Sequence, residues 1–202
     1  MKIGPAIAVG ATLALFASPS AAHFVLLEPA SWLKSDEYGN PQKLGPCGGT
    51  SDDPGTPTGA VTAVAGGSLL SVRVSERVYH PGHFRIALSV LDRSELPPDP
   101  EDVTRQGPHG PISVSGKVEQ NPKPPILVDG LWDHHVRIPN QEFATQVKLP
   151  NINCDRCSLQ VIQFMEQHAV NPDGRFTYHH CADLRISADP ALPIDTAWPG
   201  QK

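Results

Sequence analysis

The fold is decided by residues 68–91, which read SLLSVRVSERVYHPGHFRIALSVL. Two runs in this stretch carry an apolar side chain at every second position: Leu70, Val72 and Val74, then Phe84, Ile86 and Leu88. A period of two is typical of a β-strand with one buried face, because successive side chains point to opposite sides. The Pro81-Gly82 pair between the runs marks a turn. The stretch therefore predicts two strands joined by a short connection.

Short strand-like runs recur along the chain, at residues 60–65, 112–119, 142–149, 158–165 and 176–187. The 22 prolines and 17 glycines are spread between these runs, and no stretch keeps the period of a helix. We therefore predict an all-β fold, an antiparallel immunoglobulin-like or fibronectin-like β-sandwich with long loops.

Two segments in the middle of the chain have weaker patterns. The proline-rich residues 95–125 predict long surface loops on either side of one strand. Residues 131–138, LWDHHVRI, predict a polar loop with one buried tryptophan. Alternatively, Trp132, His134 and His135 line a binding surface or a second metal site.

The start of the chain has the features of a secretory signal peptide. The basic Lys2 precedes an apolar run at residues 3–17, and the small residues Ser20 and Ala22 follow it. The run is shorter than the roughly 18–20 residues that span a bilayer. We predict a signal peptide over residues 1–22, cleaved after Ala22. Cleavage one or two residues away and an uncleaved anchor are the alternatives.

The expected mature chain, residues 23–202, is long enough for a single domain with its own core, with residues 188–202 as a C-terminal tail. It is expected to be a secreted or periplasmic monomer. Loss of Lys2 takes the formal charge from −5 to −6. An acidic exported chain is a poor partner for nucleic acid or an anionic membrane. Neutral polymers and small molecules are the expected partners.

Four cysteines are present: Cys47, Cys154, Cys157 and Cys181. An even number in an exported protein favours two structural disulfides. The Cys-Asp-Arg-Cys spacing at 154–157 is also that of redox and zinc motifs. However, a redox role calls for a thioredoxin-like βαβ context, and one such pair is a weak sign of zinc.

Histidine carries the clearest chemical signal, because cleavage after Ala22 would leave His23 as the first residue. An N-terminal histidine can bind a metal through its α-amine and its ring Nδ1 together, and the α-amine has an ordinary pKa near 8. One further imidazole would complete three nitrogens, a set that suits copper. That imidazole belongs to His80 or His83, and the alternation of the strand does not choose between them.

Four stretches together resemble the lytic polysaccharide monooxygenases and their copper-binding relatives, in particular a bacterial branch. They are His23, HPGHFRIAL at 80–88, LPNINCDRCSLQVIQFM at 149–165 and FTYHHCADLRIS at 176–187. In this family an N-terminal histidine and a second histidine, the histidine brace, hold one copper ion on the flat end of a small β-sandwich. The resemblance implies His23 and His80 as the brace, because the second histidine often precedes a glycine and an aromatic residue.

The resemblance also implies two further residues near the copper ion. Tyr178 matches the aromatic residue that lies axial to copper in the last strand of the family. Gln163 matches a polar residue near the copper, although Gln160 lies in the same strand. The two glutamines are three positions apart and are expected to face opposite sides. The adjacent His179 and His180 depart from many members of the family; either could crowd the copper or donate a proton.

The disulfide pairing follows from the expected hairpin and from the family. If residues 166–176 join the last two strands, Cys181 lies beside residue 161, too far along the strand from Cys157 for a disulfide. Cys47 is then the better partner for Cys181, as similar pairings in the family tie an early loop to the last strand. Cys154 and Cys157 are left to form a small ring.

The resemblance implies a copper-dependent monooxygenase that oxidises a glycosidic carbon of a neutral polysaccharide, using an external electron donor or peroxide. Phe24, Trp32 and Tyr38 are candidates to stack on sugar rings. The alternative is a copper-binding protein that exchanges the metal with a donor or acceptor and performs no oxidation. A third class is a zinc hydrolase or a simple secreted binding module, and the hydrolase is disfavoured because the chain lacks an H-E-x-x-H motif.

Overall fold

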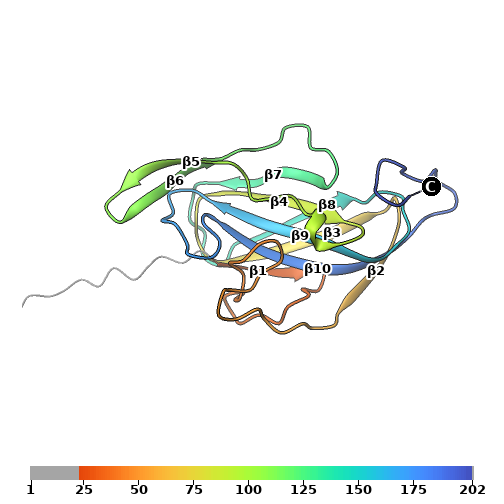
Figure 1. The fold of residues 1–202 in the computed structure, drawn as a ribbon, viewed down its shortest axis with the longest axis horizontal. Helices are drawn as coiled ribbons and strands as arrows, with labels where there is room; N and C mark the ends of the chain where they lie inside the picture. Colours follow the sequence, from red (N-terminus) through yellow and green to blue (C-terminus); the bar gives the residue numbers. More distant parts are fainter. Residues whose placement is uncertain (1–22, 202) are drawn as a thin grey trace, which may run out of the picture.

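The computed structural model describes residues 23–201, which form a β-sandwich (Figure 1). The predicted signal peptide, residues 1–22, lies outside the described residues. In chain order the elements are β1 (His23–Glu28), β2 (Val61–Ala65), β3 (Leu69–Val78), β4 (Gly82–Ser89), the short 3-10 helix η1 (Arg93–Glu95), β5 (Asp102–Gly107), β6 (Gly110–Gly116), β7 (Ile126–His134), β8 (Glu142–Lys148), β9 (Cys154–Met165) and β10 (Thr177–Ser187). No helix among these residues is long and apolar enough to cross a membrane.

Two sheets form the layers of the sandwich. One has the strand order β1-β3-β8 and the other β2-β10-β9-β4-β7. All pairs within them are antiparallel except β2 with β10, which run parallel. The predicted all-β antiparallel sandwich is therefore confirmed, with this one parallel pair at an edge; its immunoglobulin-like character remains a prediction.

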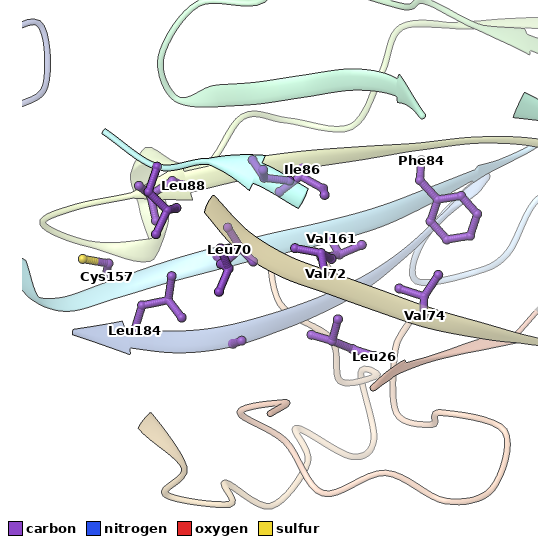
Figure 2. Close-up of a cluster of buried hydrophobic side chains, with 14 of the residues drawn as sticks. Leu26, Leu70, Val72, Val74, Phe84, Ile86, Leu88, Cys157, Val161 and Leu184 are labelled. Carbon is purple, nitrogen blue, oxygen red and sulfur yellow. The ribbon is translucent and has the colours of Figure 1, made fainter. Parts of the chain in front are cut away.

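The core lies between the two sheets and uses the faces that the alternation predicted (Figure 2). Val72 and Val74 of β3 face Phe84 and Ile86 of β4, and all four side chains are fully buried. Burial of apolar surface of this kind contributes roughly 25 cal/mol per Å². The sequence pattern thus predicted correctly which side chains of β3 and β4 form part of the core.

The turn that the Pro81-Gly82 pair predicted links the two sheets. Gly82 has a φ of +142°, and a Cβ atom there would lie 2.1 Å from the carbonyl oxygen of Phe164. Only glycine allows β4 to approach β9 so closely at this point. The turn leaves His80 between the last residue of β3 and the first residue of β4.

Two predictions for the middle of the chain were wrong. Residues 95–125 hold two strands rather than one, because β5 and β6 form an antiparallel hairpin that lies over the five-stranded sheet, with β6 against Phe164 of β9. Residues 131–134 belong to β7 and are not a polar loop. Trp132 of β7 is half-buried and stacks on Phe143 with ring centroids 5.6 Å apart. Packing between the two sheets thus outweighs the polar composition of this segment.

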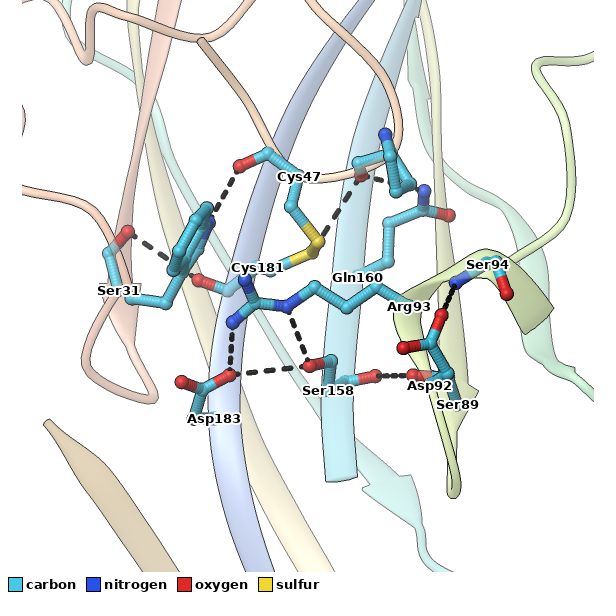
Figure 3. The surroundings of a disulfide bond; sticks show 12 residues. Ser31, Cys47, Ser89, Asp92, Arg93, Ser94, Ser158, Gln160, Cys181 and Asp183 are labelled. Atoms are coloured by element: carbon cyan, nitrogen blue, oxygen red, sulfur yellow. Dashed lines mark hydrogen bonds and ion pairs between the residues drawn. A yellow bond between two sulfur atoms is a disulfide. The ribbon is translucent and has the colours of Figure 1, made fainter. Parts of the chain in front are cut away.

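Both predicted disulfides are confirmed. Cys47 pairs with Cys181, with Cα atoms 5.0 Å apart, and ties the long loop after β1 to the last strand (Figure 3). Cys154 pairs with Cys157 at the start of β9. The loop between β9 and β10 covers residues 166–176 as expected, although Cys181 lies opposite Gln160 rather than residue 161. Two disulfides indicate an oxidising compartment.

The loop after β1 is held further by Arg93 of η1 (Figure 3). The Arg93 guanidinium lies 3.7 Å from the centre of the Trp32 ring and 2.6 Å from Asp183 of β10. The Trp32 indole N–H donates to the carbonyl of Cys47. Residues 188–201 contain no strand and pack at the end of the sandwich opposite to the start of β1, where Asn151 donates to three of their carbonyl groups.

Candidate metal centre

His23, His80 and Tyr178 meet at one end of the sandwich because three chain segments converge there. His23 opens β1 and lies opposite Val78, the last residue of β3. His80 follows two residues later, and Tyr178 is the second residue of β10. The rings of His23 and Tyr178 have centroids 5.4 Å apart, and His80 lies just beyond Val78, the residue that pairs with His23.

The start of β1 is held on both sides. The His180 ring contacts the carbonyl of Phe24 at 3.0 Å, and the side chain of Gln42 accepts the Phe24 N–H at 3.2 Å. The Nε2 atom of His23 lies 3.0 Å from Asn40 Oδ1. Because an amide oxygen only accepts, Nε2 of His23 carries the proton in this contact. That tautomer places the lone pair on Nδ1, the atom that a brace needs.

The alternative ligand, His83, lies in a different environment from His80. It is buried on the opposite face of β4 from the core residue Phe84 and stacks on Phe164, with centroids 5.5 Å apart. Alternation along β4 thus directs His83 under the β5–β6 hairpin, away from the convergence of His23 and Tyr178. The structure brings together His23 and His80.

A third imidazole, which sequence reasoning gave no role, lies beside His80. His168 is in the loop between β9 and β10, and its ring centroid is 4.6 Å from that of His80. Ser113 of β6 holds this loop, because its hydroxyl accepts the His168 N–H at 3.0 Å and its own N–H donates to the His168 carbonyl. The sequence did contain one indication that His168 lies near the site: it belongs to the loop that joins the strands of Gln163 and Tyr178.

Burial sets the protonation of this site. Burial, together with the neighbouring charges of His168 and His23, lowers the pKa of His80 to about 3, against a hydrogen bond to Val78. The ring is therefore neutral near pH 7 and can offer a lone pair to a metal. Burial also raises the pKa of Tyr178 to about 12, against a hydrogen bond with Asn171. The Tyr178 phenol thus keeps its proton.

The donor chemistry at this end of the sandwich fits a histidine brace. Among residues 23–201, no three His, Cys, Asp or Glu side chains are grouped as a metal site. A brace needs only two imidazoles, since its third nitrogen is an α-amine. That amine belongs to His23 only if the chain is cut after Ala22.

Gln163 and Gln160 face opposite sides of β9, as expected. Gln163 lies opposite Tyr178 in the strand register, is fully buried, and donates from Nε2 to Glu76 at 2.7 Å. Gln160 donates to the carbonyl of Pro46 at 2.9 Å, next to the Cys47–Cys181 disulfide. Only Gln163 points to the layer between the sheets, where the candidate site lies.

Glu76 was also missed by sequence reasoning. Its carboxylate lies inside the sandwich on β3 and accepts hydrogen bonds from Gln163, from the backbone of His80 and from His134. Burial lowers the pKa of His134, but the hydrogen bond and charge of Glu76 outweigh this, and the pKa is raised overall. Residue 76 continues the alternation of the buried residues 72 and 74, so the pattern of β3 already predicted that the Glu76 side chain faces the core.

The adjacent His179 and His180 have structural contacts. His179 lies on the outer side, where its Nε2 is 2.7 Å from Asp99 and its Nδ1 is 3.1 Å from the carbonyl of Lys43. His180 lies on the inner side, with its ring 4.7 Å from that of Phe24. Both side chains anchor segments around β10.

Of the three aromatic residues expected to meet a sugar, one lies on the surface beside the site. Tyr38 is 46% exposed, and its ring centroid is 6.0 Å from that of His23. The expectation for Phe24 was wrong, because this residue is fully buried in the core, and Trp32 is half-buried with the Arg93 guanidinium over its ring. Core packing and a cation–π contact use these rings instead.

No protein-family model and no curated protein matches this chain.

Proposed function

We propose that this protein is an exported, copper-dependent monooxygenase that oxidises a glycosidic carbon of a neutral polysaccharide. The observation that carries the proposal is the convergence of His23 and His80 beside Tyr178. These are the residues that the resemblance to lytic polysaccharide monooxygenases implies. The two disulfides agree with export to an oxidising compartment.

The α-amine and Nδ1 of His23 and the ring of His80 would hold one copper ion. When bound, copper supplies the one-electron and oxygen chemistry that the side chains lack. One oxygen atom enters a C–H bond of the sugar. If dioxygen is the co-substrate, an external donor supplies two electrons and two protons, and the second oxygen atom is released as water. If peroxide is the co-substrate, its second oxygen atom is released as water and this step needs no electron donor.

The chain's own residues shape the site. Asn40 orients the His23 ring, and the buried Tyr178 ring closes the inner side. Gln163 extends from β9 into the same inner layer and is held by Glu76. Exposed Tyr38 and Val170 border this end of the molecule and offer a small apolar surface to a sugar chain.

The test is direct. Exported protein, loaded with one equivalent of copper and supplied with ascorbate or peroxide, should release oxidised oligosaccharides from at least one of cellulose, chitin, xylan and starch. Mass spectrometry detects the products, and His80→Ala and metal-free protein are the controls. Copper-bound protein that yields no oxidised sugar from any polymer contradicts the monooxygenase.

A second candidate function is copper acquisition or delivery without oxidation. The position of His168 favours it, because an imidazole beside His80 offers a further nitrogen to which the metal can move. A carrier should pass copper(I) to a competing chelator of known affinity. Rapid transfer by wild-type protein, together with no oxidised sugar, supports the carrier over the monooxygenase.

A further inference from the structure

Glu76 is a charged side chain inside the sandwich, next to the candidate site. Its side chain is 0% exposed, and it lies on the same face of β3 as the core residues Val72 and Val74. A buried carboxylate costs several kcal/mol in lost hydration unless it is paired and hydrogen-bonded. The contacts of the Glu76 side chain therefore indicate its role.

One oxygen atom of Glu76 gathers donors from three parts of the chain. Its Oε1 accepts from Nε2 of Gln163 on β9 at 2.7 Å, from the backbone N–H of His80 at 3.1 Å, and lies 3.1 Å from Nε2 of His134 on β7. The carboxyl group of Glu76 thus binds both His80, a proposed copper ligand, and Gln163, and it connects β3 of one sheet with β7 and β9 of the other.

His134 is the partner of Glu76 on β7. Its Nδ1 lies 2.8 Å from the carbonyl oxygen of Trp132, and its Nε2 faces Glu76. The His134 ring is thus held between the carbonyl of Trp132 and the carboxyl group of Glu76, and it links β7 to β3. The rings of Phe143 and Tyr79, with centroids 5.0 and 5.8 Å from that of His134, enclose it.

Stability alone is a weak reason for this pair, because well-packed apolar residues in place of a buried ion pair are often as stable. What the pair does supply is position. His80 lies beyond the end of β3, outside the strand ladder, and its N–H bonds to the carboxylate four residues earlier. Glu76 fixes this turn from within the core.

We propose that Glu76, paired with His134, is the positioning residue of the candidate copper site, and that it holds the backbone of His80 and the amide of Gln163 in place for metal binding. The inference rests on the proposed function for its metal, but the hydrogen bonds that it describes can be tested without one.

The first experiment compares Glu76→Gln with Glu95→Gln in the exported protein. Glu95 is the matched control, because its carboxylate also accepts backbone N–H groups, those of Val90 and Leu91, outside the candidate site. Glu76→Gln should lower copper(II) affinity about tenfold and change the nitrogen couplings in the EPR spectrum, as loss of an outer-shell partner does. Glu95→Gln should leave both unchanged. Wild-type affinity and spectrum in Glu76→Gln would overturn the inference.

The second experiment uses metal-free protein. Glu76→Gln should speed hydrogen exchange of the His80 amide and shift its ring NMR signals, whereas Glu95→Gln should not. If wild-type protein binds no copper, the proposed function fails and this experiment still decides whether Glu76 positions His80; unchanged exchange and shifts would refute it.

Two further measurements apply if Glu76→Gln does not fold. His134→Gln removes the imidazole that faces Glu76 and should weaken copper binding in the same direction. In metal-free protein the same variant should speed hydrogen exchange of the His80 amide. Wild-type copper affinity and exchange in His134→Gln would overturn the pairing of Glu76 with His134.

Discussion

The rings of His80 and His168 lie with centroids 4.6 Å apart, although one follows β3 and the other lies between β9 and β10. The contact places a second imidazole beside the proposed ligand. We propose that His168 lies in the surroundings of the proposed metal and is not itself a ligand.

His168→Ala should therefore keep copper(II) affinity within about threefold and lower product formation on the order of 100-fold, as loss of a positioned proton donor does. Calorimetry and a peroxide-driven product assay measure the two quantities. The exposed His109→Ala is the control. A large loss of affinity in His168→Ala would instead make His168 a ligand and favour the carrier.

The choice between His80 and His83 predicts opposite results for two variants. His80→Ala should weaken copper(II) binding by about 3 kcal/mol, on the order of 100-fold in Kd, because the chelate loses one nitrogen. His83→Ala should change affinity little, because its ring stacks on Phe164 under the hairpin. Competition with a chelator of known affinity measures both. Reversed effects would show that the ligand is His83.

Processing should expose His23. The exported protein should begin His-Phe-Val, because Ser20 and Ala22 occupy the cleavage positions. Intact-mass analysis distinguishes this terminus from neighbouring ones. A mature chain that begins at Ala21 or Phe24 lacks the required amine, and the brace then cannot form.

The two disulfides should contribute unequally to stability. Removal of the Cys47–Cys181 bridge, with a sequence separation of 134, should lower the free energy of unfolding by about 5 kcal/mol in the chain-entropy account. The Cys154–Cys157 bridge, with a separation of 3, should contribute about 2 kcal/mol. Denaturant unfolding of the two double alanine variants tests the difference. Equal losses would contradict it.

His180 should make the fold sensitive to acid. Burial, then the charge of His179, lowers the pKa of His180 from 6.5 to about 4, against a hydrogen bond to Phe24. The unfolded chain binds this proton more readily than the folded protein does. The contribution of neutral His180 to the free energy of unfolding is therefore complete above about pH 6.5 and is lost as the pH falls toward about 4. The free energy of unfolding should decrease by roughly 3 kcal/mol over this range.

Denaturant unfolding between pH 4 and pH 7 measures this dependence. In His180→Gln, stability should fall less steeply with acid than in wild-type protein, while His109→Ala should follow wild-type protein. Parallel profiles for wild type and His180→Gln would show that His180 does not titrate in this range.

The sequence by itself determined the strands whose faces alternate, the turn at Pro81-Gly82, the loop at residues 166–176 and the pairing of the four cysteines. These features rest on local rules, because period two shows which residues share a face and chain separation limits which cysteines can meet. The strands at 102–107 and 126–134 escaped prediction. The first forms a local hairpin with residues 110–116 in a polar, proline-rich stretch that lacks a clear alternation, and the second is defined by its pairing with β4, which is distant in the chain.

Only the tertiary structure decided which histidines meet. Alternation predicted that Phe84 faces the core and His83 the opposite side, but not where His23 and Tyr178 lie, so His80 and His83 became distinguishable only once these two residues were placed. His168 and Glu76 reach the candidate site through contacts between segments far apart in the chain. Such contacts depend on how two sheets pack and on where a loop is anchored, and neither is encoded in a local pattern.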